Sequence, residues 1–216
     1  MVEDKLCYPL TLPQRSFYYD YLLLKDNCKY NMGGYLLLNG SLNLDIFRQA
    51  YKYAVLNYDI SKLRFILKDD ELMQCFTDDY DPDINYLDFR NAENPIEKAV
   101  NYVLEENMSP LPFVESPLFY DIIIQTADSQ FIWFPRFHHF SNDAYGRSII
   151  NNAIAITYNN LLNGAGFPEL KSFSYLDFLE DDLKYRKSED FVKSSEYWRE
   201  RLTPLPDPLA FTVKKK

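Results

Sequence analysis

The sequence predicts an α/β sandwich, in which helices pack on a mixed β-sheet. Segments with strand character alternate with amphipathic helical segments along the 216 residues. The two strongest strand segments, residues 118–125 and 131–137, are almost continuously apolar, as strands covered on both faces are. A hydrophobic content of 47% with 17% aromatic residues indicates a packed core in one large or two small domains.

The first quarter of the chain predicts a helix, a strand and a second helix. Thr11 is expected to cap a short aromatic helix with Pro13 in its first turn. A strand is expected over residues 30–38, closed by a turn at Asn39-Gly40. A helix over residues 44–58 would bury one apolar stripe: Ile46, Phe47, Ala50, Tyr51, Ala54 and Val55.

The next segment predicts a hairpin and a third helix. Strands over residues 63–67 and 71–76 flank a turn at Lys68-Asp69-Asp70, and residues 79–85 are polar and turn-rich. Asn94, Pro95 and Glu97 predict a helix start with a capping box. The expected buried stripe of this helix is Ile96, Ala99, Val100, Val103 and Leu104.

After the two apolar strands the chain becomes mostly helical. Pro135 cannot donate to a β-ladder, so the end of the second strand is expected at a sheet edge or a bulge. A long helix follows, ended by Asn163-Gly164, with the stripe Ile149, Ile150, Ala153, Ile154, Thr157, Tyr158 and Leu161. Two more helices are expected over residues 175–186 and 190–202, before the prolines Pro204, Pro206 and Pro208.

Charge and cysteine content exclude several classes of protein. A net charge of −9 and a pI near 4.8 argue against nucleic-acid or anionic-membrane partners. The start of the chain does not resemble a signal peptide, and no apolar run approaches the ~20 residues of a membrane span. Cys7, Cys28 and Cys75 are odd in number and widely spaced, so we expect reduced thiols in a cytoplasmic protein.

The only two histidines, His138 and His139, are adjacent and lie where a buried strand gives way to a helix. Ligands usually bind at such a strand end in open α/β sheets. Histidine exchanges a proton near neutral pH, so acid–base chemistry is expected here. Because side chains alternate along a strand, one ring should face the packing and the other a cleft.

The residue types around the pair exclude two kinds of chemistry. No further histidine and no cysteine cluster completes a metal site, so no metal is expected. Ser141 does not lie in a Gly-x-Ser-x-Gly elbow, so a covalent serine mechanism is not expected. What remains is a histidine that takes or holds a proton of an amine or hydroxyl attacking an acyl group. Asp143 would either pair with a basic side chain or cap the following helix.

The run from His138 to Ala144 resembles the HHxxxDG signature of condensation domains of nonribosomal peptide synthetases, in the chloramphenicol-acetyltransferase-like superfamily. Residues 10–18 resemble the opening helix motif of that family, and residues 57–65 lie where its second motif belongs. Residues 175–178 and 196–198 match the helices that close its first subdomain. The resemblance covers nearly the whole chain but only the first half of a complete domain.

The resemblance implies roles for individual residues. His139 would be the catalytic histidine, as general base or by positioning the amine, and His138 and Asp143 would shape the loop. Ala144 replaces the final glycine of the signature. The family's arginine partner of the motif aspartate is absent, so Lys62 or Arg64 would have to pair with Asp143, and lysine lacks the bidentate fork.

The resemblance also implies an architecture and partners. Residues 1–203 would be the N-terminal subdomain, and residues 204–216 a proline-rich linker or an artificial end. No cofactor would be bound, because both substrates arrive on the phosphopantetheine arms of carrier proteins. Further partners would be the C-terminal subdomain and a nearby adenylation domain.

Three functions fit these observations. The first is the N-terminal half of an amide-forming condensation domain, inactive without its other half. The second is an acyltransferase that uses acyl-CoA and a free alcohol or amine. The third is a degenerate domain that only docks carrier proteins, suggested by Lys62 in place of the arginine.

Overall fold

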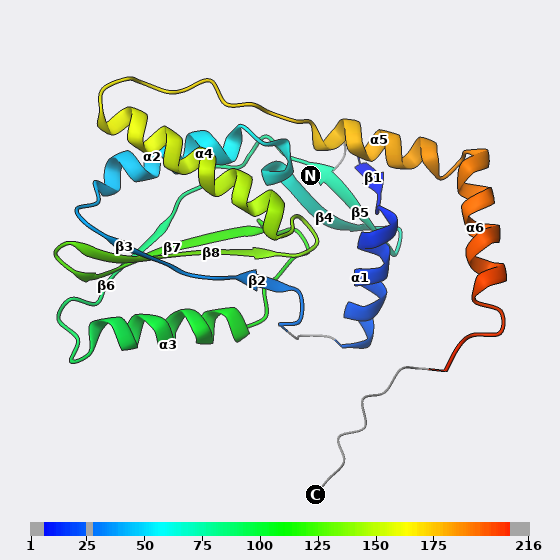
Figure 1. Ribbon diagram of the computed structural model, residues 1–216, viewed down its shortest axis with the longest axis horizontal. Helices are drawn as coiled ribbons and strands as arrows, with labels where there is room; N and C mark the ends of the chain where they lie inside the picture. The colour runs from blue at the N-terminus through cyan, green and yellow to red at the C-terminus, as the bar shows by residue number, and fades with distance from the viewer. Residues whose placement is uncertain (1–6, 25–27, 208–216) are drawn as a thin grey trace, which may run out of the picture. The chain divides into compact units, whose positions relative to one another are not determined.

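The computed structural model describes residues 7–24 and 28–207, which form two compact units, one ending at Tyr175 and the other beginning at Leu176 (Figure 1). Some of the sequence expectations concern residues outside the described ranges: Met1–Lys5, Pro208 and the C-terminal lysines. The first unit holds two sheets and four α-helices among these residues, and the second holds two helices.

The larger sheet has five strands. β7 (Phe119–Ala127) and β8 (Gln130–His138) pair antiparallel at its centre, and β6 (Asn85–Asp88) pairs parallel with β7. β2 (Asn31–Gly33) and β3 (Leu36–Asn39) both pair antiparallel with the other side of β8. Parallel and antiparallel pairs occur together, so the predicted mixed sheet is confirmed.

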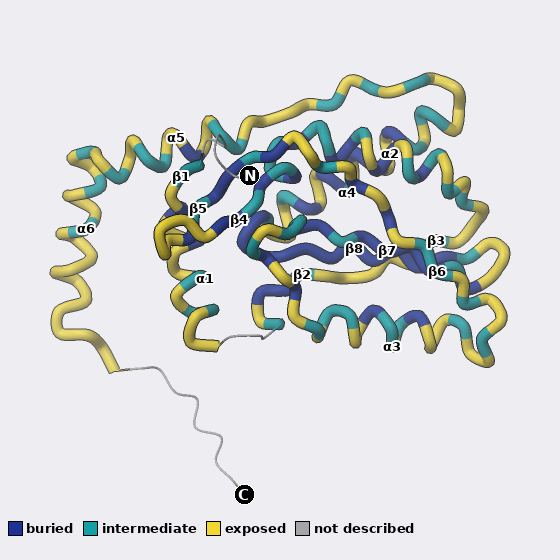
Figure 2. Tube along the Cα trace, turned by 180° about the vertical axis from the view of Figure 1, so that it is seen from behind, coloured by how far each residue is buried: buried dark blue, intermediate teal, exposed yellow. Residues whose placement is uncertain are grey.

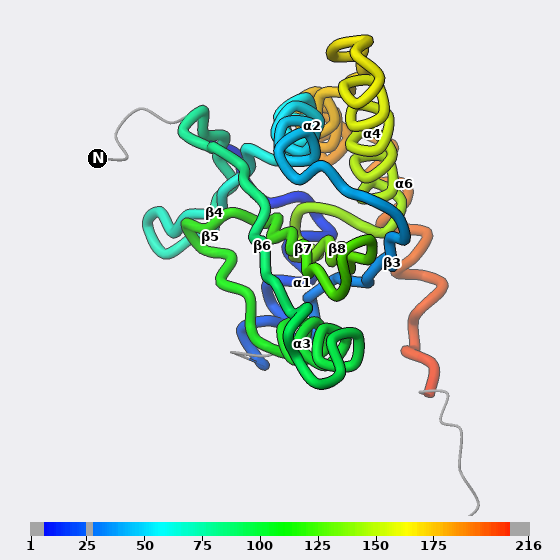
Figure 3. Tube along the Cα trace, turned by 90° about the vertical axis from the view of Figure 1, so that its left-hand side faces the viewer, coloured from blue at the N-terminus to red at the C-terminus, as the bar shows by residue number. Residues whose placement is uncertain are grey.

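Helices cover both faces of this sheet. α2 (Leu44–Leu56) and α4 (Ala144–Leu162) pack together on one face, and α3 (Pro95–Met108) lies on the other (Figure 3). Alternate residues of the central strands serve the two faces: Ile122 and Ile124 pack with Ala99 of α3, whereas Ile123 joins the core with α2 and α4. The strands are therefore buried on both sides, as predicted, and they form the darkest part of Figure 2.

The smaller sheet is antiparallel and consists of β1 (Cys7–Pro9), β5 (Glu71–Phe76) and β4 (Leu63–Lys68). Asp69 and Asp70, with φ values of 51° and 63°, form the predicted hairpin turn. A short 3₁₀ helix, η1 (Asp59–Lys62), leads from α2 into β4. α1 (Leu12–Leu23) follows β1 and starts with a capping box in which Thr11 and Gln14 bond each other's backbone N–H.

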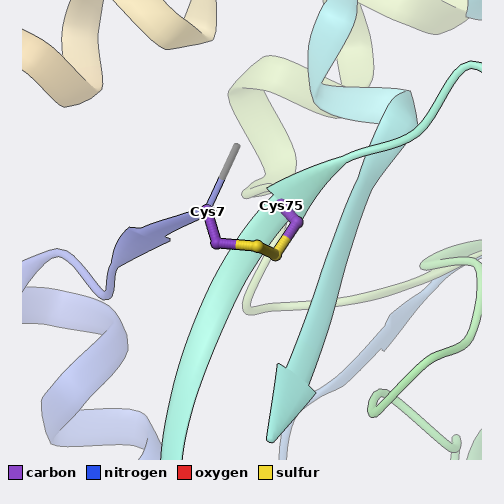
Figure 4. Close-up of a disulfide and its surroundings, with 2 residues drawn as sticks. All are labelled: Cys7 and Cys75. Atoms are coloured by element: carbon purple, nitrogen blue, oxygen red, sulfur yellow. A yellow bond between two sulfur atoms is a disulfide. The ribbon is translucent and has the colours of Figure 1, made fainter. Parts of the chain in front are cut away.

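The structure corrects the expectation of reduced thiols for two of the three cysteines. Cys7 and Cys75 are directly opposite each other in the β1–β5 pair, with Cα atoms 4.4 Å apart, and form a disulfide (Figure 4). Strand pairing brings together two residues 68 positions apart, which spacing along the sequence does not reveal. Cys28 is a free thiol.

The prediction for Pro135 is also wrong. β8 has neighbours on both sides, so its end is not an edge, and its register shift with β7 lies at Gln125/Ala127 instead. The registers of β2 and β3 with β8 place Pro135 opposite Gly34, between these two strands. Because proline offers no N–H, the neighbouring strand is interrupted there, and the single strand expected over residues 30–38 is split in two.

Two expectations for α3 fail. The backbone at Asn94 lies at φ −129° and ψ 80°, and its side chain makes no cap hydrogen bond, so no capping box forms. Of the predicted stripe only Ala99 and Val103 are buried, while Ile96 and Leu104 are exposed because the sheet covers only the centre line of the helix.

The second unit consists of α5 (Tyr175–Tyr185, whose first residue belongs to the first unit) and α6 (Glu189–Arg201). Ser188 caps α6 by accepting a hydrogen bond from Phe191 N–H. Along its whole length α6 has no buried residue, and large side chains such as Tyr197 and Trp198 are exposed.

Candidate active site

The histidine pair lies where the sequence predicts, at the end of the central strand β8. His138 is the last residue of the strand, and residues 139–143 form the turn into α4. The backbone N–H of His138 donates to Leu118 O at 3.1 Å, and that of His139 donates to Tyr30 O at 2.8 Å. The end of the strand is thus anchored to the chain on both sides of β8.

His138 is a buried, neutral residue. Its side chain is 3% exposed and lies among the rings of Tyr30, Phe113 and Phe140. Burial, with a smaller contribution from the charge of His139, lowers the pKa of His138 to about 4. Nδ1 accepts a hydrogen bond from Phe140 N–H at 3.2 Å, so the proton of the neutral ring is on Nε2. His138 therefore stabilises the turn.

His139 is half-buried, and its ring is held in one tautomer. Nδ1 lies 2.8 Å from the carbonyl oxygen of Asn142. A carbonyl only accepts, so Nδ1 carries the proton and Nε2 of the neutral ring keeps its lone pair. Phe17 of α1 packs against the ring, with centroids 5.3 Å apart. Nε2 has no hydrogen-bond partner among the described residues, which leaves it available to accept a proton from a ligand.

Asp143 acts as the N-cap of α4. Its carboxylate accepts a hydrogen bond from Gly146 N–H at 2.7 Å, and its own N–H donates to the Asn142 side chain at 2.9 Å. A Cβ at Gly146 would collide with Asn142 Oδ1, so a larger residue there would displace the Asn142 side chain from its bond to Asp143 N–H. Ala144, in place of the signature glycine, is the exposed first residue of α4 and is accommodated there.

The structure does not bring Lys62 or Arg64 to Asp143. Lys62 forms an ion pair with Asp78 at 2.9 Å. Arg64 donates to the carbonyl oxygens of Ser61 and Leu63 and lies over the ring of Tyr80. Both basic residues belong to the smaller sheet and its 3₁₀ helix, whereas Asp143 lies at the end of the larger sheet. Of the two roles that the sequence left open for Asp143, the cap is the one that the structure contains.

A buried ion pair that the sequence analysis missed joins α4 to the larger sheet. Arg147, one turn into α4, bonds the carboxylate of Asp121 on β7. Trp133 Nε1 donates a hydrogen bond to the same carboxylate at 2.9 Å. The Tyr51 hydroxyl also donates to this carboxylate, at 3.3 Å. Burial raises the pKa of Asp121, and the three donors oppose this rise. The sequence did contain a signal for this pair, because Asp121 is a charged residue within the mostly apolar strand expected over residues 118–125.

A groove of about 340 Å³ borders the site. It lies where β2 and β3 are interrupted, and it is lined by Gly34, Pro135, Ala144 and Arg147 among others. The groove thus connects the gap in the sheet with the N-terminal turn of α4. No cluster of metal-ligating side chains occurs in the described part of the chain, and none of its helices is both long and apolar enough to span a membrane.

The family described as "Condensation domain" matches residues 5–213, nearly the whole chain. The chain therefore belongs to the condensation-domain family of nonribosomal peptide synthetases. The dimodular nonribosomal peptide synthase of Bacillus subtilis (strain 168) is 27% identical over 202 residues, covering 94% of this chain and 8% of the relative. Enterobactin synthase component F of Shigella flexneri is 26% identical over 186 residues, covering 85% and 14%.

Solved structures show the same fold. The starter condensation domain of rhizomide synthetase superposes with a TM-score of 0.86 at 26% identity, covering 94% of this chain and 49% of that one. A variant of that domain with an arginine replaced, in complex with C8-CoA, has a TM-score of 0.88 at 25% identity, covering 97% and 48%. The chain spans about half the length of these domains and a small part of the synthetases.

Proposed function

We propose that this chain is the N-terminal half of a condensation domain that forms amide bonds in nonribosomal peptide synthesis. The donor would be an acyl or peptidyl thioester and the acceptor an aminoacyl amine, each on the phosphopantetheine arm of a carrier protein. The family match and the half-length coverage of solved condensation domains support this proposal. An adenylation domain would load the acceptor, and because that step consumes ATP, we place the reaction in the cytoplasm.

The observation that carries the proposal is the state of His139. The acceptor nitrogen attacks the thioester carbon, a C–N bond forms, and the C–S bond of the donor arm breaks. The amine must lose a proton, and the released thiolate must gain one. Nε2 of His139 has the lone pair to take or hold that proton, because Nδ1–H is committed to Asn142 O.

The remaining residues of the turn would act by placing His139. His138 fills the space behind the turn, Asp143 caps α4, and Arg147 ties α4 to the sheet. A solved double variant of the rhizomide synthetase domain, 25% identical to this chain, has a histidine and an arginine eight positions further along replaced. His139 and Arg147 have the same separation in this chain. This supports a joint role of the two positions.

The direct test is His139→Ala in the complete synthetase, with donor and acceptor loaded on their carrier proteins. Loss of a general base or proton holder lowers turnover by roughly 10²- to 10⁴-fold. Product formation is measured by mass spectrometry, and Lys68→Ala, on the exposed hairpin, is the control that should keep full turnover. Unchanged turnover of His139→Ala would leave only a carrier-docking role. Turnover with acyl-CoA and a free amine or alcohol, but not with loaded carrier proteins, would make the chain part of a different acyltransferase.

A further inference from the structure

Gln14 of α1 is the centre of a buried hydrogen-bond network. Its side chain is buried, with the residue 5% exposed. The amide nitrogen donates to the Tyr175 hydroxyl at 2.9 Å, to Phe140 O at 3.1 Å and to Gln74 Oε1 at 3.3 Å. The amide oxygen accepts from the N–H and the hydroxyl of Thr11, which starts the helix. One side chain thus connects α1, β5 and the histidine turn.

The turn that carries His139 has few bonds to the rest of the chain. Most of its hydrogen bonds are internal: His139 Nδ1 to Asn142 O, and the N–H and hydroxyl of Ser141 to His138 O. In the part of the chain that the structure describes, two hydrogen bonds join backbone groups of residues 139–142 to residues outside the turn. His139 N–H donates to Tyr30 O, and Phe140 O accepts from Gln14.

The bond to Gln14 is placed where it controls the ring of His139. Phe140 lies between His139 and Asn142, so a rotation of its peptide group would move the carbonyl that holds Nδ1–H. Phe17, three residues after Gln14 on the same helix, packs against the His139 ring at 5.3 Å. α1 therefore contacts the turn twice: Gln14 bonds its backbone at Phe140, and Phe17 packs against the imidazole of His139.

We propose that Gln14 is a positioning residue that keeps the turn in the form in which Asn142 fixes the tautomer of His139. Its importance for turnover rests on the proposed function, but its effect on the imidazole does not. Without the amide donor, the buried carbonyl of Phe140 has lost its partner and the turn can rearrange to satisfy it. Both ring tautomers of His139 would then be populated.

The test uses the fact that the chain has only two histidines. In protein labelled with ¹⁵N-histidine at pH 8, above the ordinary histidine pKa of ~6.5, the ring signals report the tautomer directly. The wild-type His139 should show a protonated Nδ1 and an unprotonated Nε2, and His138 the reverse. In Gln14→Glu, which keeps an acceptor for the Thr11 N–H but loses the amide donor, the His139 signals should move toward a mixture of tautomers.

Two further variants make the test decisive. Gln14→Met has a similar length, cannot donate at any pH, and should give the same mixture. Tyr175→Phe removes another partner of Gln14 but leaves its bond to Phe140, so the His139 signals should stay as in wild type. Wild-type signals in both Gln14 variants, or an equal change in Tyr175→Phe, would overturn the proposal.

The same variants separate this proposal from the proposed function. In the complete synthetase, Gln14→Met should lower kcat with little change in KM, because it misplaces a proton acceptor and removes no substrate contact. A change in tautomer without a change in turnover would leave Gln14 as a positioning residue and contradict a proton role of His139. Loss of turnover in His139→Ala with unchanged ring signals in the Gln14 variants would support a proton role of His139 and contradict the positioning role of Gln14.

Discussion

Two adjacent histidines have opposite properties because the strand ends between them. His138, as the last residue of β8, points into the aromatic core, while His139 begins the turn and is half-buried. The hydrogen bonds assign the ring protons in opposite ways: Nδ1 accepts in His138, and Nδ1 faces a carbonyl in His139. One ring is therefore kept neutral for packing, and the other presents a lone pair.

The lowered pKa of His138 predicts a pH-dependent loss of stability. The unfolded chain binds a proton at its ordinary pKa of ~6.5, whereas the folded chain binds it only near a pKa of about 4. As pH falls from ~6.5 to ~4, the unfolded state gains the proton first, and the free energy of unfolding should decrease by about 3 kcal/mol from this group. Urea unfolding at a series of pH values measures it.

Two variants isolate the contribution of His138 from that of the many carboxylates. His138→Gln has no titrating side chain and should lose less stability than wild type over this pH range. Lys68→Gln, on the exposed hairpin, keeps both histidine rings and should follow the wild-type curve. An identical pH dependence of wild type and His138→Gln would show that the ring of His138 is not the source.

At the scale of the elements, α4 fixes the C-terminal end of the turn that carries His139, while α1 contacts the turn through Gln14 and Phe17. The N-terminal turn of α4 is capped by Asp143, and Arg147 joins the start of the helix to Asp121, near the beginning of β7. The groove beside the site follows from another element: Pro135 interrupts the pairing of the neighbouring strand, and the hollow opens between β2 and β3. The cap at Asp143 thus fixes the turn, and the missing N–H of Pro135 accounts for the groove.

The buried pair of Asp121 and Arg147 predicts strong coupling between two substitutions. Asp121→Asn leaves the arginine buried without its counter-charge and should lower the free energy of unfolding by about 3–5 kcal/mol. The double variant Asp121→Asn, Arg147→Met removes both charges and should cost clearly less than the sum of the single variants. Urea unfolding of the four proteins measures this coupling.

A matched control lies on the surface. Asp128 pairs with Arg90 at 3.1 Å but is almost fully exposed, so Asp128→Asn should hardly change the stability. Additive effects of Asp121→Asn and Arg147→Met would contradict an energetic coupling between the two side chains.

At the scale of the whole molecule, His139 is set in a fold that covers about half the length of the solved condensation domains. Large apolar side chains on α6, such as Tyr197 and Trp198, are exposed. In the proposed function, the C-terminal half of the domain supplies the opposite wall of the site.

We therefore predict that this chain alone forms little or no amide product. Holding two reactants in attack geometry and excluding water can contribute roughly 7–11 kcal/mol to lowering a barrier, and an open site loses most of it. Loaded donor and acceptor carrier proteins are incubated with the chain, with the chain plus the C-terminal half of the domain, and with the complete domain. Product should appear only where both halves are present, and full turnover by the chain alone would refute the proposal.

The sequence by itself determined the layers of the fold and the place of the site. Continuous apolar runs predict doubly covered strands such as β8, and the histidine pair at its end marks the strand-to-helix turn, because these signals are local in the chain. The short strands β1 and β6 were missed, since three or four residues carry too little pattern to be recognised before a neighbour pairs with them.

Only the tertiary structure decided which distant residues meet. Strand pairing joins Cys7 to Cys75, packing of α4 on the sheet joins Arg147 to Asp121, and α1 brings Gln14 to the carbonyl of Phe140, 126 positions away. It also separates Asp143 from Lys62, at the end of η1, and from Arg64, in the smaller sheet. Local propensity and periodicity act over a few residues, whereas these contacts depend on how whole elements pack, which spacing along the chain does not encode.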